Sequence, residues 1–136
     1  MPREADAEGA RECLRMAQDD LDFAAGYPTP NRHYLRLCFI AQEAAERAID
    51  AVLVAQGVEV PFIYDLGGLL DLVPATVPVP PEVHQAVALS TYGDESLYPA
   101  CSDPPGEQAW REALRLAAAV VAWAEAALEP GRTAAA

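Results

Sequence analysis

The pattern of hydrophobic and polar positions is mainly helical, and apolar residues are densest in the segment CFIAQEAAERAIDAVLVAQG at residues 38–57. Polar side chains in and before this segment recur at spacings of three, four and seven residues, which places them on one face of a 3.6-residue period. These side chains are Arg32, Arg36, Glu43, Glu46, Arg47 and Asp50. The remaining surface is apolar and rich in alanine, and such a helix must be covered on several sides. The segment is therefore predicted to be the central helix of a bundle.

Two further long helices are predicted from the same periodicity. In residues 4–25 apolar side chains alternate at spacings of four and three, and Gly26 followed by Pro28 ends the helix. Residues 107–129 carry two apolar stripes, which together cover more than half of the helix surface. The central helix is expected to begin with Thr29 as its cap and Pro30 in its first turn, and to end at Gln56 before Gly57. The short connection between the first two helices predicts an antiparallel hairpin.

Prolines divide the segment between the second and last long helices into shorter elements. A short helix is predicted over residues 65–73, with Asp65 as its cap and with Gly67 and Gly68 weakening it. Another helix is predicted over residues 82–92, with Pro80 and Pro81 in its first turn. The loop GDESLYPACSDPPG follows. The expected fold is thus all-α: one domain over residues 1–136, an antiparallel up-and-down four-helix bundle with a short additional helix and a frayed tail at about residues 130–136.

Composition narrows the classes of function. The three cysteines are far apart and odd in number, the amino terminus is charged and acidic, and there is no run of 18 apolar residues. A cytoplasmic protein without a membrane role is expected. The formal charge is −12 and the chain contains no lysine, so extended binding to nucleic acid is not expected. No metal site or cofactor is predicted, because His33 and His84 have no ligand spacing and the Gly67-Gly68 pair has no phosphate-loop context.

Six residues are candidates for binding a nucleotide or a partner. Gln42 and Glu46 are four residues apart on the central helix, where an amide and a carboxylate are able to receive a base, an arginine or a backbone group together. The other candidates, in the irregular parts of the chain, are Tyr64, Asp65, Tyr92 and Tyr98. Each also has a structural explanation: a solvated stripe with Glu43-Arg47 pairing for the helix, a helix cap for Asp65, and buried rings for the tyrosines.

Taken in order, these pieces resemble the HEPN domain, a small helical domain of prokaryotes and higher eukaryotes. Four features carry the resemblance over nearly the whole chain. The first is the amphipathic first helix with Ala17, Asp20, Leu21 and Ala24. The second is the segment CFIAQEAAERAI, which resembles the family core cf-x-Q-x-A-E-k-a-l, and the third is GVEVPFIYDLGGLLDLV, which resembles g-x-x-x-P-x-x-H-D-L-x-x-L-L. The fourth is Tyr98-Pro99, which stands in place of an R-Y-P turn.

The resemblance implies a homodimeric helical bundle and offers two activities. Some members are metal-independent endoribonucleases that use an arginine followed after four to six residues by a histidine, and others pair with a nucleotidyltransferase encoded beside them, often as toxin and antitoxin. This chain departs from the family at three positions: Tyr64 replaces the histidine before Asp65, Leu97 replaces the arginine before Tyr98, and Asp50 replaces a basic residue. The Arg-x4-6-His pattern is not found, so no catalytic residue is assigned.

Three functions remain open from the sequence. The preferred one is a non-catalytic HEPN-like homodimer that binds a protein partner, a nucleotidyltransferase in a toxin-antitoxin-type pair. The second is a nucleotide-binding or RNA-cleaving HEPN protein with a degenerate site. The third is a purely structural helical module.

Overall fold

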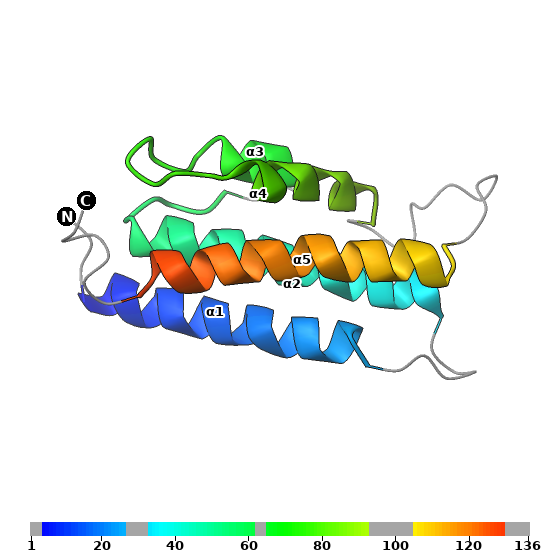
Figure 1. The fold of residues 1–136 in the computed structure, drawn as a ribbon. Coiled ribbons are helices and arrows are strands. Elements are labelled where there is room, and N and C mark those ends of the chain that lie inside the picture. The colour runs from blue at the N-terminus through cyan, green and yellow to red at the C-terminus, as the bar shows by residue number, and fades with distance from the viewer. Residues whose placement is uncertain (1–3, 27–32, 62–64, 93–104, 130–136) are drawn as a thin grey trace.

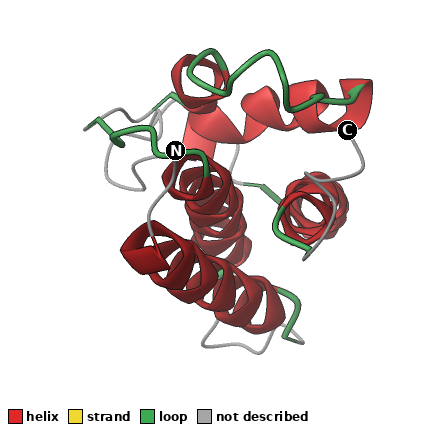
Figure 2. Ribbon diagram, turned by 90° about the vertical axis from the view of Figure 1, so that its left-hand side faces the viewer, coloured by secondary structure: helices red, strands yellow, loops and turns green. Residues whose placement is uncertain are grey.

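The computed structural model describes residues 4–26, 33–61, 65–92 and 105–129, and every regular element in these ranges is helical (Figures 1 and 2). Three long helices, α1 (Glu4–Ala24), α2 (Tyr34–Ala55) and α5 (Glu107–Ala127), lie side by side. The short helices α3 (Leu66–Leu70) and α4 (Pro81–Gln85), with the 3-10 helix η1 (Ala86–Tyr92), form a fourth layer. The predicted all-α bundle with a short additional helix is confirmed.

Successive layers alternate in direction. In Figure 1, α1 runs one way, α2 returns, the α4 and η1 segment runs parallel to α1, and α5 returns parallel to α2. This up-and-down path places the carboxyl end of α1 beside the amino ends of α2 and α5. There the Trp110 ring lies 5.7 Å from the Tyr34 ring, and its indole Nε1 donates a 2.8 Å hydrogen bond to the carbonyl oxygen of Ala24.

Helix α2 is the central element, as its pattern predicts. It packs against α1, α5, α3 and η1. Half of its residues are buried, and the small ones let neighbouring helices approach closely. The buried residues of α2 are Leu37, Cys38, Ala41, Gln42, Ala44, Ala45, Ala48, Ile49, Ala51, Val52 and Leu53.

The ends of the helices show where local sequence signals hold and where they fail. Gly57 takes a positive φ of 73° after α2, and the N–H groups of Gly57 and Val58 donate to the carbonyls of Val54 and Leu53. This Schellman-type end requires glycine. Asp65 caps α3 as predicted, because its Oδ1 accepts a 3.0 Å hydrogen bond from the N–H of Gly67.

The predicted start of α2 is wrong. His33 is the N-terminal cap residue with extended backbone, and the helix begins at Tyr34, not at Pro30. Thr29 and Pro30 lie outside the described residues. Helix α3 also ends earlier than predicted, at Leu70 before Pro74, and the second half of the predicted helix over residues 82–92 is the 3-10 helix η1. Tyr34, the first residue of α2, packs against Trp110.

Candidate functional site

The polar stripe of α2 lines a shallow pocket on the surface of the bundle. The pocket has a volume of about 190 Å³, and we call it the acidic pocket. Its lining residues are Glu43, Glu46, Arg47 and Asp50. They occupy one side of the helix because their spacings of three, four and seven match the helical period. Three carboxylates and one guanidinium thus share a small, partly enclosed space.

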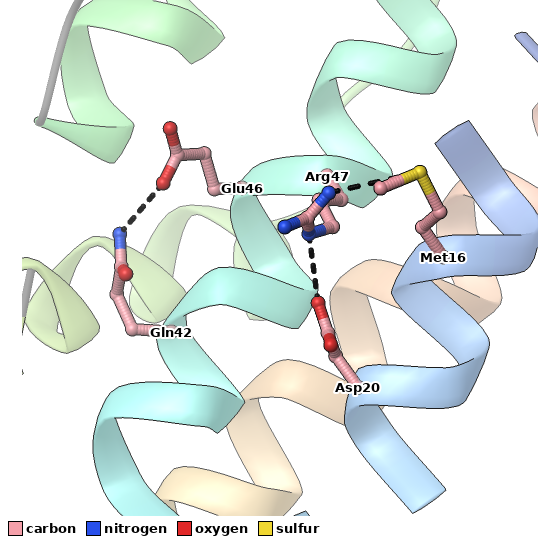
Figure 3. Close-up of polar contacts among 5 residues, drawn as sticks. All are labelled: Met16, Asp20, Gln42, Glu46 and Arg47. Carbon is pink, nitrogen blue, oxygen red and sulfur yellow. Dashed lines mark hydrogen bonds and ion pairs between the residues drawn. The ribbon is translucent and has the colours of Figure 1, made fainter. Parts of the chain in front are cut away.

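Gln42 contacts the pocket residue Glu46 and is buried, with only 1% of its surface exposed. Its Nε2 donates to Glu46 Oε2 over 3.4 Å, and Figure 3 shows the two side chains pointing toward each other. Gln42 Oε1 is buried without a hydrogen-bond partner. Gln42 and Glu46 therefore bond to each other, whereas the sequence suggested only that they are able to receive a ligand together. The stripe is not simply solvated, however, because Gln42 is a buried polar group with an unused acceptor.

The pocket residue Arg47 is bound to α1. Arg47 Nε lies 2.8 Å from Asp20 Oδ2, and Arg47 Nη1 lies 3.7 Å from Met16 Sδ (Figure 3). The described ion-pair partner of Arg47 is thus a carboxylate on another helix, whereas the sequence suggested Glu43 one turn away. The cation in the pocket is already engaged with this carboxylate.

The protonation of the pocket is set mainly by burial. Burial raises the pKa of Asp50 to about 6, with the negative charge of Glu46 acting in the same direction and Arg47 in the opposite one. Burial also raises the pKa of Glu46, and the hydrogen bond from Gln42 offsets part of that increase. Asp50 Oδ1 is buried and has no hydrogen-bond partner. The pocket thus holds carboxylates whose negative charge is incompletely compensated.

The other four candidate residues serve elsewhere or lie outside the described ranges. Asp65 Oδ1 is 3.3 Å from the hydroxyl of Ser90, and the same hydroxyl accepts a hydrogen bond from the N–H of Leu66, so Asp65 joins α3 to η1. Tyr92 packs against the core at the end of η1 and forms a hydrogen bond with Cys38. Burial raises the pKa of the Cys38 thiol to about 11, although that hydrogen bond lowers it in part. Tyr64 and Tyr98 lie outside the described residues.

Two acidic residues at this site are not among the candidates that the sequence offers. Asp50 lies on the polar stripe and departs from the family pattern, but the sequence does not report its burial. Asp20 on α1 pairs with the pocket residue Arg47, and the sequence marks it only as a match in the first helix. One sequence feature does indicate the pocket: Glu43, Glu46 and Asp50 are spaced by three and four residues. This spacing places the three carboxylates on one side of the helix, whichever element packs over them.

The described residues offer neither a metal site nor a membrane span. No group of three or more histidine, cysteine, aspartate or glutamate side chains within them is arranged to hold a metal ion. In the same ranges, no helix is long and apolar enough to cross a membrane. Chemically, the acidic pocket is suited to receive hydrogen-bond donors and positive charge.

Comparison with known proteins identifies the class. The family model of the HEPN domain matches residues 10–127, and the chain therefore belongs to the HEPN family. Among solved structures, it is similar to that described as the crystal structure of TT1696 from Thermus thermophilus, with a TM-score of 0.75 and 30% sequence identity over 85% of this chain and 95% of that chain. None of the curated proteins matches this chain.

Proposed function

We propose that this chain is a non-catalytic HEPN homodimer that binds a protein partner, a nucleotidyltransferase encoded beside it in a toxin-antitoxin-type pair. The observation that carries the proposal is the composition of the acidic pocket. It presents three carboxylates and a guanidinium already paired with Asp20, and no imidazole lines it. The buried amide of Gln42 bonds to one of these carboxylates, Glu46. Binding a partner uses these groups directly, whereas an endoribonuclease of this family needs an arginine and a histidine that act together on a phosphate.

One feature of the sequence and one of the structure support a non-catalytic role. The Arg-x4-6-His pattern does not occur, and both histidines are exposed on separate elements, His33 at the start of α2 and His84 on α4. The pocket carboxylates also repel phosphate groups, which disfavours the second candidate function, a nucleotide-binding or RNA-cleaving protein.

Co-expression with the product of the adjacent reading frame tests the proposal. A tag on this chain is expected to recover that product in a stoichiometric complex, and light scattering on the free protein is expected to give twice the 14.5 kDa mass of one chain. A homodimer that binds no neighbouring gene product would contradict partner binding. A monomer at micromolar concentration would contradict the dimer.

The alternatives have their own tests. A nucleotide present at one hundred times its dissociation constant adds about 2.7 kcal/mol to stability, so a thermal-shift screen across common nucleotides detects the second candidate function. A purely structural module predicts that Gln42→Ala and Glu46→Ala alter neither partner binding nor dimerisation. Loss of binding in both variants, with the fold intact, would exclude that third function.

A further inference from the structure

Two unused hydrogen-bond acceptors lie at the acidic pocket, one on the lining residue Asp50 and one on Gln42, which bonds to the lining residue Glu46. Gln42 Oε1 belongs to a side chain of which only 1% is exposed, and its amide faces Glu46 in the pocket lining (Figure 3). Asp50 Oδ1 is inaccessible to solvent and also unpaired. Buried acceptors without partners are rare in native proteins, and each costs free energy until a donor reaches it. Two of them beside an excess of negative charge indicate a missing donor that is positively charged.

The shape of the pocket narrows the kind of cation. The carboxylates do not converge closely enough to hold a metal ion, since the described residues contain no such cluster. A volume of about 190 Å³ corresponds to about six water molecules, which is ample for a planar guanidinium. A guanidinium carries five N–H donors in a fixed plane and is able to engage separated carboxylates and an amide oxygen together.

We propose that the acidic pocket receives an arginine side chain of a protein partner. This inference rests on the proposed function in one respect, the existence of that partner, and it names the chemistry by which the partner is recognised. An apolar side chain beside the pocket favours a protein over a free small molecule. Met16 on α1 is 39% exposed and touches the pocket residue Arg47. A protein surface that carries the arginine covers this apolar side chain as well.

Charge makes a second copy of this chain a poor source of the arginine. Each copy carries 9 arginines against 21 acidic residues, and Arg15, Arg111 and Arg115 already lie against a carboxylate of their own helix. The pocket therefore attracts a basic partner more strongly than a second acidic copy. Charge complementarity therefore favours a different protein over a second copy.

The raised pKa values of the pocket carboxylates agree with this assignment. Burial and mutual repulsion disfavour the charged forms of Asp50 and Glu46 in the free protein. A guanidinium placed between them reverses the repulsion and satisfies their oxygens. Binding is accordingly expected to weaken as the pH falls below about 6 and Asp50 takes up its proton.

The first test uses a defined probe and does not need the partner. Backbone amide chemical shifts of the full-length protein are followed during titration with N-acetyl-arginine amide, and with N-acetyl-citrulline amide as its neutral counterpart of equal shape. The arginine probe is expected to shift amides of residues 42–50, and citrulline is not. Glu46→Gln and Asp50→Asn are each expected to weaken this binding roughly tenfold. Glu8→Gln, which alters an exposed carboxylate on α1, is the matched control and leaves it unchanged.

Equal responses to arginine and citrulline would overturn the inference, as would arginine binding that survives both pocket substitutions. Thermal unfolding of each variant verifies that the fold is intact, and the amide-for-carboxyl replacements preserve shape. The second test repeats the capture of the neighbouring gene product with Glu46→Arg and with Glu8→Arg. If only Glu46→Arg fails to capture the neighbouring gene product, the result supports the acidic pocket as the arginine-binding site.

The two tests separate the inference from the proposed function. If no neighbouring product is captured but the arginine probe binds at residues 42–50, the proposed function fails and the pocket chemistry stands. If the product is captured equally by the wild-type chain and by Glu46→Arg, partner binding stands and the arginine site is overturned.

Discussion

The indole of Trp110 at the start of α5 donates a buried 2.8 Å hydrogen bond to the carbonyl oxygen of Ala24 at the end of α1. This bond joins two helices through residues that are 86 positions apart in the chain. The carbonyl belongs to the last turn of α1, where no later N–H of the helix is able to reach it. Trp110 thus supplies a donor that the helix itself lacks.

Trp110→Phe is expected to lower the free energy of unfolding by about 1–3 kcal/mol, because it leaves the Ala24 carbonyl buried without its donor. Urea unfolding followed by circular dichroism measures the loss. Trp123→Phe is the matched control, since the Trp123 indole donates to the Pro78 carbonyl at an exposed position where water is able to replace it. Equal losses in the two variants would contradict a special role for the bond between α1 and α5.

Asp50→Asn is expected to flatten the dependence of stability on pH. The folded-state pKa of Asp50 is raised from 3.8 to about 6, so between these values the folded protein binds more protons than the unfolded chain. The stability of the wild type therefore falls as pH rises from about 4 to about 6, and the loss persists above pH 6. Glu46 raises this pKa, Arg47 lowers it, and Cys13 is the facing titratable group on α1.

At pH 7 the Asn variant is expected to be more stable than the wild type by about 1 kcal/mol, a value reduced from the full pKa shift because the pocket is open to solvent on one side. Unfolding midpoints in denaturant at pH 4, 5, 6 and 7 measure the difference. A wild-type protein whose stability rises steadily from pH 4 to pH 7, with an identical slope in Asp50→Asn, would exclude this effect.

Gly9→Ala is expected to stabilise the protein by about 0.5–1 kcal/mol. Gly9 lies within α1, where alanine has the higher helix propensity, and an added Cβ would meet Val54 Cγ1 at an ordinary contact distance of 3.5 Å. Gly57→Ala provides the opposite case, because its φ of 73° strains any residue with a Cβ. Thermal melts are expected to move in opposite directions for the two variants, and a rise in both would refute this account of Gly57.

Val121→Arg on α5 is expected to abolish cooperative unfolding, because it places a charge in the buried face of the bundle at a cost that exceeds about 4 kcal/mol. Ala44→Arg on α2 is expected to have the same effect. Ala118→Arg, at an exposed position of α5, is the control and should fold normally. Near-ultraviolet circular dichroism distinguishes the outcomes, and a native spectrum for Val121→Arg would show that this face is not part of the core.

The fold class, the order of the helices and the central place of α2 follow from the amino-acid pattern alone. These properties depend on periodicity, since apolar residues at spacings of three and four must face a neighbour regardless of which neighbour it is. Two helix ends are also predictable from the sequence: Asp65 caps α3 and Gly57 ends α2. Both are predictable because capping interactions act within a few residues.

The surroundings of the polar stripe of α2 depend on tertiary packing. The sequence shows the stripe and the four-residue spacing of Gln42 and Glu46, but burial depends on the layers that fold over α2 from distant parts of the chain. Those layers enclose Gln42, raise the pKa of Asp50 and bring Asp20 on α1 to Arg47 on α2. Desolvation and cross-helix charge pairing are properties of the packed neighbours, and no local pattern in the sequence reports them.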